Sequence, residues 1–169
     1  MKIKLLRYFG DKCVTKSRME VWMDGEDAPR LVCEAREPKF RDYVVSFSGV
    51  SHFCLPIGKW KMEVGNSPYG AMGLRVPRCT GHRQVFIGHH WNRQWMEGVI
   101  LIGESDLEIK GIDVLDNAVR GIKNGEDMYQ RLTELVYEAY GKGEEFWMEI
   151  DNKDLYRYEE EGQEILHRR

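Results

Sequence analysis

The sequence lacks the two features that direct a chain into or across a membrane. No stretch approaches the roughly 20 consecutive apolar residues that a membrane-spanning helix needs. Residues 1–12, MKIKLLRYFGDK, alternate apolar side chains with lysines and contain no continuous apolar core of the kind found in secretory signals. We therefore expect a protein without a membrane span or signal peptide, located in the cytoplasm or associated with a phage.

Clustered cysteine is absent as well. The four cysteines, Cys13, Cys33, Cys54 and Cys79, are far apart and never form a C-x-x-C pair. Such spacing favours separate thiols in a reducing compartment over a disulfide framework.

The chain also has no excess of positive charge, since its formal net charge is −3. Overall basicity is therefore not available to grip nucleic-acid phosphates, and a nucleic-acid partner is not expected. Basic side chains could still form a local rim, and the candidates for it are Lys59, Lys61, Arg75, Arg78, Arg83 and Arg93.

What the sequence does contain is sufficient for one folded domain. With 169 residues, 42% of them hydrophobic, the chain can bury a core without a metal or a disulfide. We expect residues 1–150 to form a single β-rich domain. The charged stretch 151–169 is expected to be a polar extension, either a solvated helix or a loose tail.

Alternating polarity predicts that most of the domain is strands. Residues 1–9, 17–25 and 30–38 suggest a three-stranded antiparallel meander with a turn at Asp24-Gly25. In FCLPIGKWKMEVG, Trp60, Met62 and Val64 alternate with charged residues, which indicates a half-buried strand. The continuous apolar run GVILIG is typical of a central strand that is covered on both faces.

One helix is predicted in GEDMYQRLTELVYEAYGKG, where Met128, Leu132, Val136 and Ala139 recur at helical spacing and Gly141 supplies the stop. EFWMEID then reads as the last strand. The expected fold class is α+β: a mostly antiparallel β-sheet or flattened β-barrel with one packed amphipathic helix.

The candidate site lies in residues 85–105. VFIGHHWNRQWMEGVILIGES places a cluster of rings, an amide and a guanidinium directly before a buried strand. Tryptophan can stack on a sugar or cap a peptide while its polar neighbours orient the ligand. The predicted ligand-binding residues are His89, His90, Trp91, Asn92, Arg93 and Trp95; the alternative is that the indoles cover the edge of the sheet.

The order of the motifs VWMDGEDAPRLVCEAREPKFRD, LPIGKWKMEV and VFIG…EGVILIG resembles a small bacterial and phage family of domains of unknown function. Its members read D-G, C-x-T-L-E-D, I-P-x-G-x-Y-x-V, I-x-I-H-x-G-N and G-C-I-L-V-G in that order. The resemblance covers roughly residues 1–150, and that family is in turn similar to the L,D-transpeptidases. It implies a β-rich domain with a phage or prophage association.

The resemblance to transpeptidases implies a thiolate nucleophile activated by a histidine. An ungapped alignment puts Val99 where the family has its cysteine and Gly88 where it has its histidine. We therefore predict a non-catalytic binding or structural protein with a degenerate site, whose partner is another protein or a cell-wall glycopeptide.

Two other uses of these residues remain alternatives. A relocated pair of Cys54 or Cys79 with His89 or His90 would make a cysteine-dependent transpeptidase or amide hydrolase. Cys79 and the histidines at 82, 89 and 90 have zinc-binding side chains, but their spacing does not match a closed zinc site, so no metal or other cofactor is expected.

Overall fold

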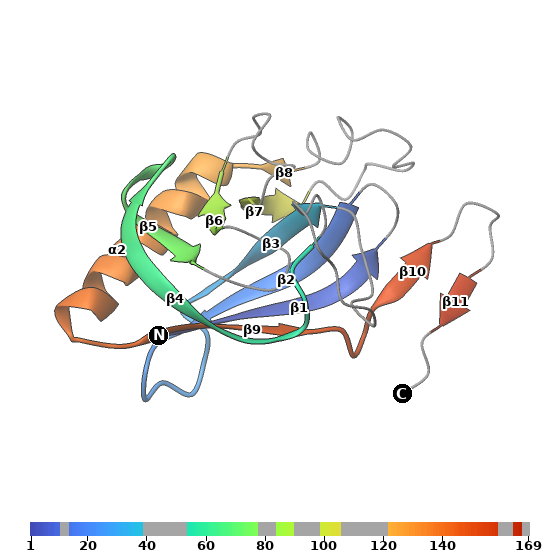
Figure 1. Cartoon of the computed structure of the whole chain (residues 1–169), viewed down its shortest axis with the longest axis horizontal. Helices are drawn as coiled ribbons and strands as arrows, with labels where there is room; N and C mark the ends of the chain where they lie inside the picture. The colour runs from blue at the N-terminus through green and yellow to red at the C-terminus, as the bar shows by residue number, and fades with distance from the viewer. Residues whose placement is uncertain are drawn as a thin grey trace.

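The computed structural model describes residues 1–10, 14–38, 54–77, 84–89, 99–105, 122–158 and 164–166 (Figure 1). Its elements in chain order are β1 Lys2–Gly10, β2 Val14–Trp22, β3 Leu31–Pro38, β4 Gly58–Ser67, β5 Gly70–Val76, β6 Val85–Gly88, β7 Val99–Ser105, β8 Ile122–Lys123, α2 Gly125–Gly141, β9 Phe146–Asp151, β10 Tyr156–Tyr158 and β11 Glu164–Leu166.

Eight of these strands close into a barrel. The order is β1-β2-β3-β7-β6-β5-β4-β9, and β9 pairs back onto β1 from Lys2↔Trp147 to Leu6↔Asp151. Pairing is mostly antiparallel, with parallel contacts between β1 and β9 and between β6 and β7. The expectation of a mostly antiparallel β-barrel with one packed helix is confirmed, and the run VILIG is central as predicted, between β3 and β6.

The barrel is filled by one apolar core built from alternate residues of the strands. Ile3, Leu5, Met19 and Val21 illustrate the period of two on β1 and β2, with exposed fractions of 1% or less. The predicted alternation on β4 is also present, because Met62 is buried while Lys61 and Glu63 are exposed. Side chains on the inner surface of these strands therefore pack against one another, and the charged neighbours of Met62 meet water.

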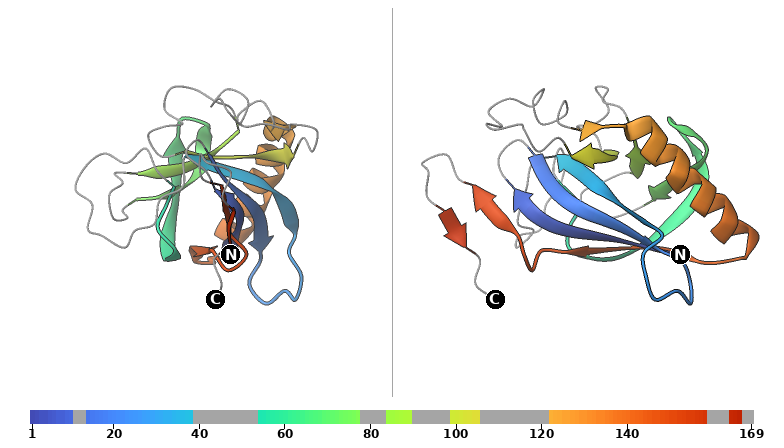
Figure 2. Two further views of the ribbon diagram at one scale, coloured as in Figure 1. Left: turned by 90° about the vertical axis from the view of Figure 1, so that its right-hand side faces the viewer. Right: turned by 180° about the vertical axis from the view of Figure 1, so that it is seen from behind.

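Helix α2 completes this core from outside the strands. It contacts β7, β5 and β3 and runs from β8 to the start of β9 (Figures 1 and 2). Met128, Leu132, Val136 and Ala139 belong to the same cluster as the inward-facing strand residues. These are positions that the helical spacing predicts to be apolar and buried.

The helix ends at Gly141, where the sequence predicts its stop. The glycine with the left-handed backbone lies two residues further on, Gly143 at φ 73°. The Glu144 amide donates to the Ala139 carbonyl and the Gly143 amide to the Tyr140 carbonyl, both at 3.0 Å, which is a Schellman ending. Glycine is favoured where φ is positive, and Gly143 is that position.

The prediction of a solvated helix or loose tail after residue 151 is wrong where the structure describes it. β10 pairs in parallel with β1 at Phe9↔Tyr156, beyond the point where β9 ends, and β11 pairs with β10. Because β1 is longer than β9, its edge at Phe9 and Gly10 still offers hydrogen bonds, and β10 takes them.

Among the described residues no helix is long and apolar enough to cross a membrane.

Candidate functional site

The structure describes only part of the site that the sequence predicts. His89, Cys54, Gly88 and Val99 lie in described segments. The remaining predicted residues lie outside the described residues, so the predictions made for them stay predictions: Cys79, His82, His90, Trp91, Asn92, Arg93 and Trp95.

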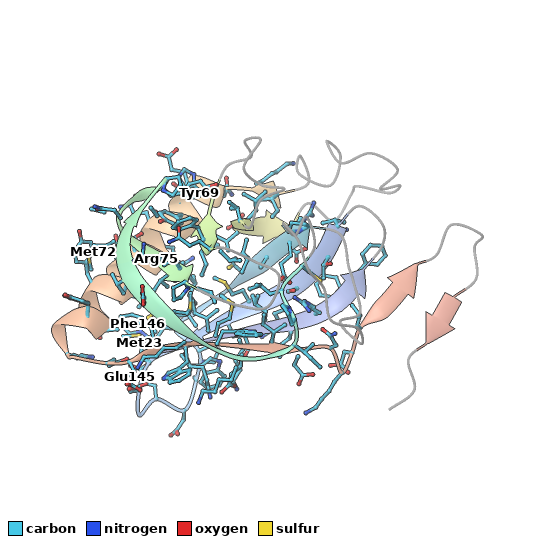
Figure 3. All side chains as sticks on the ribbon, in the orientation of Figure 1. Met23, Tyr69, Met72, Arg75, Glu145 and Phe146 are labelled. Carbon is cyan, nitrogen blue, oxygen red and sulfur yellow. The ribbon has the colours of Figure 1, made fainter. Side chains whose placement is uncertain are left out.

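His89 directly follows β6 and is held against the first turns of α2. A Cβ added at Gly125, the first residue of the helix, would lie 2.5 Å from the His89 carbonyl oxygen, so this approach requires glycine. The imidazole ring lies 5.0 Å from the Tyr129 ring and 5.5 Å from the Tyr69 ring, measured between centroids. We call His89, Tyr69 and Tyr129 the ring cluster; Tyr69 is labelled in Figure 3.

The two phenols of the ring cluster are neutral at ordinary pH. Burial raises the pKa of Tyr69 to about 12, and the neighbouring Tyr129 adds to the effect. Burial also raises the pKa of Tyr129, against the opposing effect of its hydrogen bond with Ser67. The cluster therefore presents flat apolar surface together with hydrogen-bond donors and acceptors, a combination that suits holding a ligand.

Tyr69 also packs against Gly88, the position that the sequence alignment sets against a histidine. A Cβ at Gly88 would lie 2.3 Å from Cζ of Tyr69, so the phenol ring already occupies the space that a side chain at 88 would enter. In the parallel pairing of β6 with β7, Gly88 lies beside Leu101 and Phe86 beside Val99.

Val99, where the family has its cysteine, is equally enclosed. Its exposed fraction is 2%, and it forms a small apolar cluster with Val14 and Leu101. Tyr69 packs against this cluster as well. The phenol ring of Tyr69 therefore lies against Gly88 and against the cluster that contains Val99.

The described thiols are buried, and neither is in a disulfide. Burial, together with the nearby carboxylate of Glu34, raises the pKa of Cys33 to about 12. The thiolate is the nucleophilic form of cysteine, so this thiol is unreactive near neutral pH. Cys54 has an exposed fraction of 0% and precedes Leu55 at one end of the barrel.

Sequence analysis missed a buried ion pair at that end. The Arg7 guanidinium donates to both carboxylate oxygens of Glu37, at 2.8 Å and 2.7 Å, and both side chains are at most 1% exposed. Glu37 Oε1 also accepts from the Leu55 amide at 3.0 Å, and Arg7 donates to Asn152 Oδ1 at 3.3 Å. The pair therefore joins β1, β3, the approach to β4 and the turn after β9.

A second polar cluster lies on the other face of β3. The Tyr8 hydroxyl lies 2.6 Å and 2.8 Å from the two carboxylate oxygens of Glu34, and Arg36 Nε is 3.7 Å from one of them. Burial raises the pKa of Glu34, while the hydrogen bond from Tyr8 and the charge of Arg36 oppose the rise. Glu34 and Arg36 alternate along β3 with the inward-facing Cys33 and Ala35. The outward direction of Glu34 and Arg36 was therefore predictable, but their burial was not.

Within the described ranges no group of three or more histidine, cysteine, aspartate and glutamate side chains is placed to hold a metal ion. Comparison of the chain with protein-family models, with curated proteins and with solved structures finds no match.

Proposed function

We propose that the protein is a non-catalytic binding protein, built on a barrel whose transpeptidase-like position no longer carries a nucleophile. The observation that carries the proposal is the environment of Gly88 and Val99. The ring of Tyr69 fills the space beside Gly88, and Val99 is packed among apolar side chains. An enzyme of the family's kind would need a thiolate and an imidazole facing a common cleft there.

The partner in this proposal is another protein or a cell-wall glycopeptide, bound by the segment His89 to Trp95. The ring cluster supports this placement because it fixes His89, the first residue of the segment, between two neutral phenols. Tryptophan, asparagine and arginine follow in the sequence and can add stacking and hydrogen bonds. A role in the assembly of a phage or prophage particle is the specific form that the family resemblance suggests.

The binding test uses a muramyl peptide, titrated into the protein by isothermal calorimetry. Trp91→Ala and Trp95→Ala should each weaken the interaction while the circular dichroism spectrum stays unchanged. Tyr137→Ala is the matched control, since Tyr137 is an exposed aromatic residue on α2. Unchanged affinity in both tryptophan variants would remove the segment from the binding surface.

The rival enzyme is tested by thiol chemistry. Iodoacetamide should alkylate the native protein slowly at pH 7.5, and mass spectrometry after denaturation should show all four thiols reactive. Fast alkylation of Cys54 or Cys79 that His89→Ala slows would instead indicate a histidine-activated nucleophile. In that case the non-catalytic proposal fails, whatever the calorimetry shows.

A further inference from the structure

The outer surface of the barrel carries a row of alternating tryptophan and lysine. Residues directly opposite one another on β2, β1, β9 and β4 are Trp22, Lys2, Trp147 and Lys61. Their chain neighbours Val21, Ile3 and Met148 face the core, so this row faces outward. With neighbouring strands about 4.8 Å apart, the two tryptophans are separated by roughly 10 Å.

Both indoles of this row are held in the same way. The Trp22 Nε1–H donates to Glu20 at 3.1 Å, and the Trp147 Nε1–H donates to Glu145 at 3.2 Å. Each partner is the glutamate two residues earlier in the chain, Glu20 on β2 and Glu145 just before β9. Lysine ammonium groups also lie over the rings. Lys4 is 4.5 Å from the Trp22 centroid, and Lys59 and Lys61 are 4.6 Å and 5.5 Å from the Trp147 centroid.

Ordered rings are favourable for ligand binding because less side-chain freedom is lost when the ligand arrives. The rings are also only partly buried, unlike the tightly packed aromatic residues of a core. An indole fixed at the surface can therefore offer one flat apolar side at low entropic cost.

A groove of about 300 Å³ opens at this row, and we call it the indole groove. It lies between the turn after β2 and the first half of β9, at the end of the barrel marked by Met23 and Glu145 in Figure 3. The side chains that line it include Trp22, Trp147, Lys2, Lys59, Asp24 and Glu149. Two aromatic rings, two ammonium groups and several carboxylates thus face one small opening.

The mixture of charges limits the class of ligand. The carboxylates of Asp24, Glu26 and Glu149 are matched by the ammonium groups of Lys2 and Lys59 and by the N-terminal ammonium of Met1, which forms an ion pair with Asp24 at 2.8 Å. A phosphate-rich ligand such as single-stranded nucleic acid needs a basic track beside the stacking rings, and here the acids would repel it. A purely apolar ligand would remove these charged groups from water without offering them hydrogen bonds, which is unfavourable.

A sugar matches all three kinds of group. Its hydroxyls donate to carboxylates and accept from ammonium groups, and its C–H faces pack on aromatic rings. We propose that the indole groove binds a neutral oligosaccharide, with sugar rings stacked on Trp22 and Trp147 and hydroxyl groups held by Lys2, Lys59 and Glu149. The inference rests on the proposal that the chain is a binding protein, but it uses a different surface from the His89 segment.

The test is a titration of the full chain with three neutral probes, chitotetraose, cellotetraose and maltotetraose, followed by tryptophan fluorescence and calorimetry. At least one probe should bind. Trp22→Ala and Trp147→Ala should each weaken it about tenfold, because the loss of a stacked ring has the size of one decade in Kd. Tyr140→Ala removes an exposed ring elsewhere, on α2, and should leave affinity unchanged.

A second variant, Glu149→Gln, keeps the inference testable if a tryptophan variant fails to fold. It keeps the shape of the side chain and alters one proposed acceptor, so it should weaken the same probe with an unchanged melting temperature. If none of the three probes binds, or if binding is intact in both tryptophan variants and in Glu149→Gln, the inference is overturned.

Two further outcomes separate this inference from the proposed function. Sugar binding that Trp91→Ala abolishes and Trp22→Ala leaves intact would overturn the indole groove and support the His89 segment. An oligothymidylate that binds and loses affinity in Trp22→Ala would overturn the sugar assignment in favour of single-stranded nucleic acid. Sugar binding lost only in the Trp22 and Trp147 variants would support the inference even if the muramyl peptide fails to bind.

Discussion

Charged side chains on the two surfaces of β1 have different environments, because those facing the inside of the barrel are buried and those facing outward are partly exposed. On its inner side, Arg7 is 1% exposed and bound to Glu37 through two hydrogen bonds. On its outer side, Lys2 and Lys4 lie beside tryptophan rings and near several carboxylates. An inner charge is committed to one partner, whereas an outer charge can exchange its partner for water or a ligand.

The difference follows from the cost of removing charge from water. A buried ion loses its hydration, so its attraction to one well-placed partner must compensate, and both ions depend on the pair remaining intact. An exposed ion keeps most of its hydration, and its pairing contributes little. We therefore expect buried charges to determine stability and exposed charges to determine recognition.

The largest expected effect comes from Arg7→Met. This change leaves Glu37 buried without its cation, so the free energy of unfolding should fall by about 3–5 kcal/mol, measured by urea denaturation. The double variant Arg7→Met with Glu37→Leu removes both charges and should recover much of the loss. A single-variant loss below about 1 kcal/mol would mean that the pair behaves like a surface pair.

Gly88→Ala should have the next largest effect, because the added methyl group meets the Tyr69 ring. Overpacking of this kind costs about 1–3 kcal/mol of unfolding free energy. Combining it with Tyr69→Ala should cost less than the sum of the two single changes, since the obstacle is then gone. Strict additivity in a double-mutant cycle would show that the two residues do not compete for one space.

Glu34 faces outward on β3 but is buried, and its effect on stability can be tested through pH. Its pKa in the folded protein is raised above the ordinary value of 4.5, so between that value and the folded pKa the unfolded chain releases the proton first. The contribution of Glu34 is therefore fully present below about pH 4.5 and is lost as pH rises through the folded pKa. Relative to Glu34→Gln, the native chain should lose stability from pH 4 to pH 8 in thermal melts; a gain over that range would reverse the sign.

The smallest effect is expected on the outer surface, from Glu63→Gln. Glu63 lies directly opposite Arg75 in the pairing of β4 with β5, and the two side chains are 3.1 Å apart and partly exposed. The variant should change the unfolding free energy by less than about 1 kcal/mol, and added salt should reduce even this difference. A loss comparable to that of Arg7→Met would abolish the distinction between the two surfaces.

Local patterns predicted the strands and the helix because the information lies within each segment. The alternation in MKIKLLRYF places Ile3, Leu5 and Arg7 on one face, and the structure puts all three inside. That Arg7 pairs with Glu37 could not be predicted from a local pattern. Glu37 is 30 residues away in the chain, and the two side chains meet because β2 pairs with both β1 and β3. The parallel closure of β9 on β1 is non-local for the same reason.

The candidate site was predictable only in composition. His89 stood out by its neighbours in sequence, but Tyr69 and Tyr129 come from the β4–β5 turn and α2, and no local spacing connects them. The tryptophans at 22 and 147 share the short pattern Glu-x-Trp, a signal that the sequence did contain. Its meaning depended on the register that places both residues beside Lys2.

The closure of the barrel also has a consequence for how the chain folds as it leaves the ribosome. Lys2 pairs with Trp147, so the last seam of the barrel joins strands from opposite ends of the described chain. Contacts of such large sequence separation form late and slow folding, because a long loop must close first. Until β9 emerges, one edge of β1 has no strand beside it and remains open to pairing with another chain.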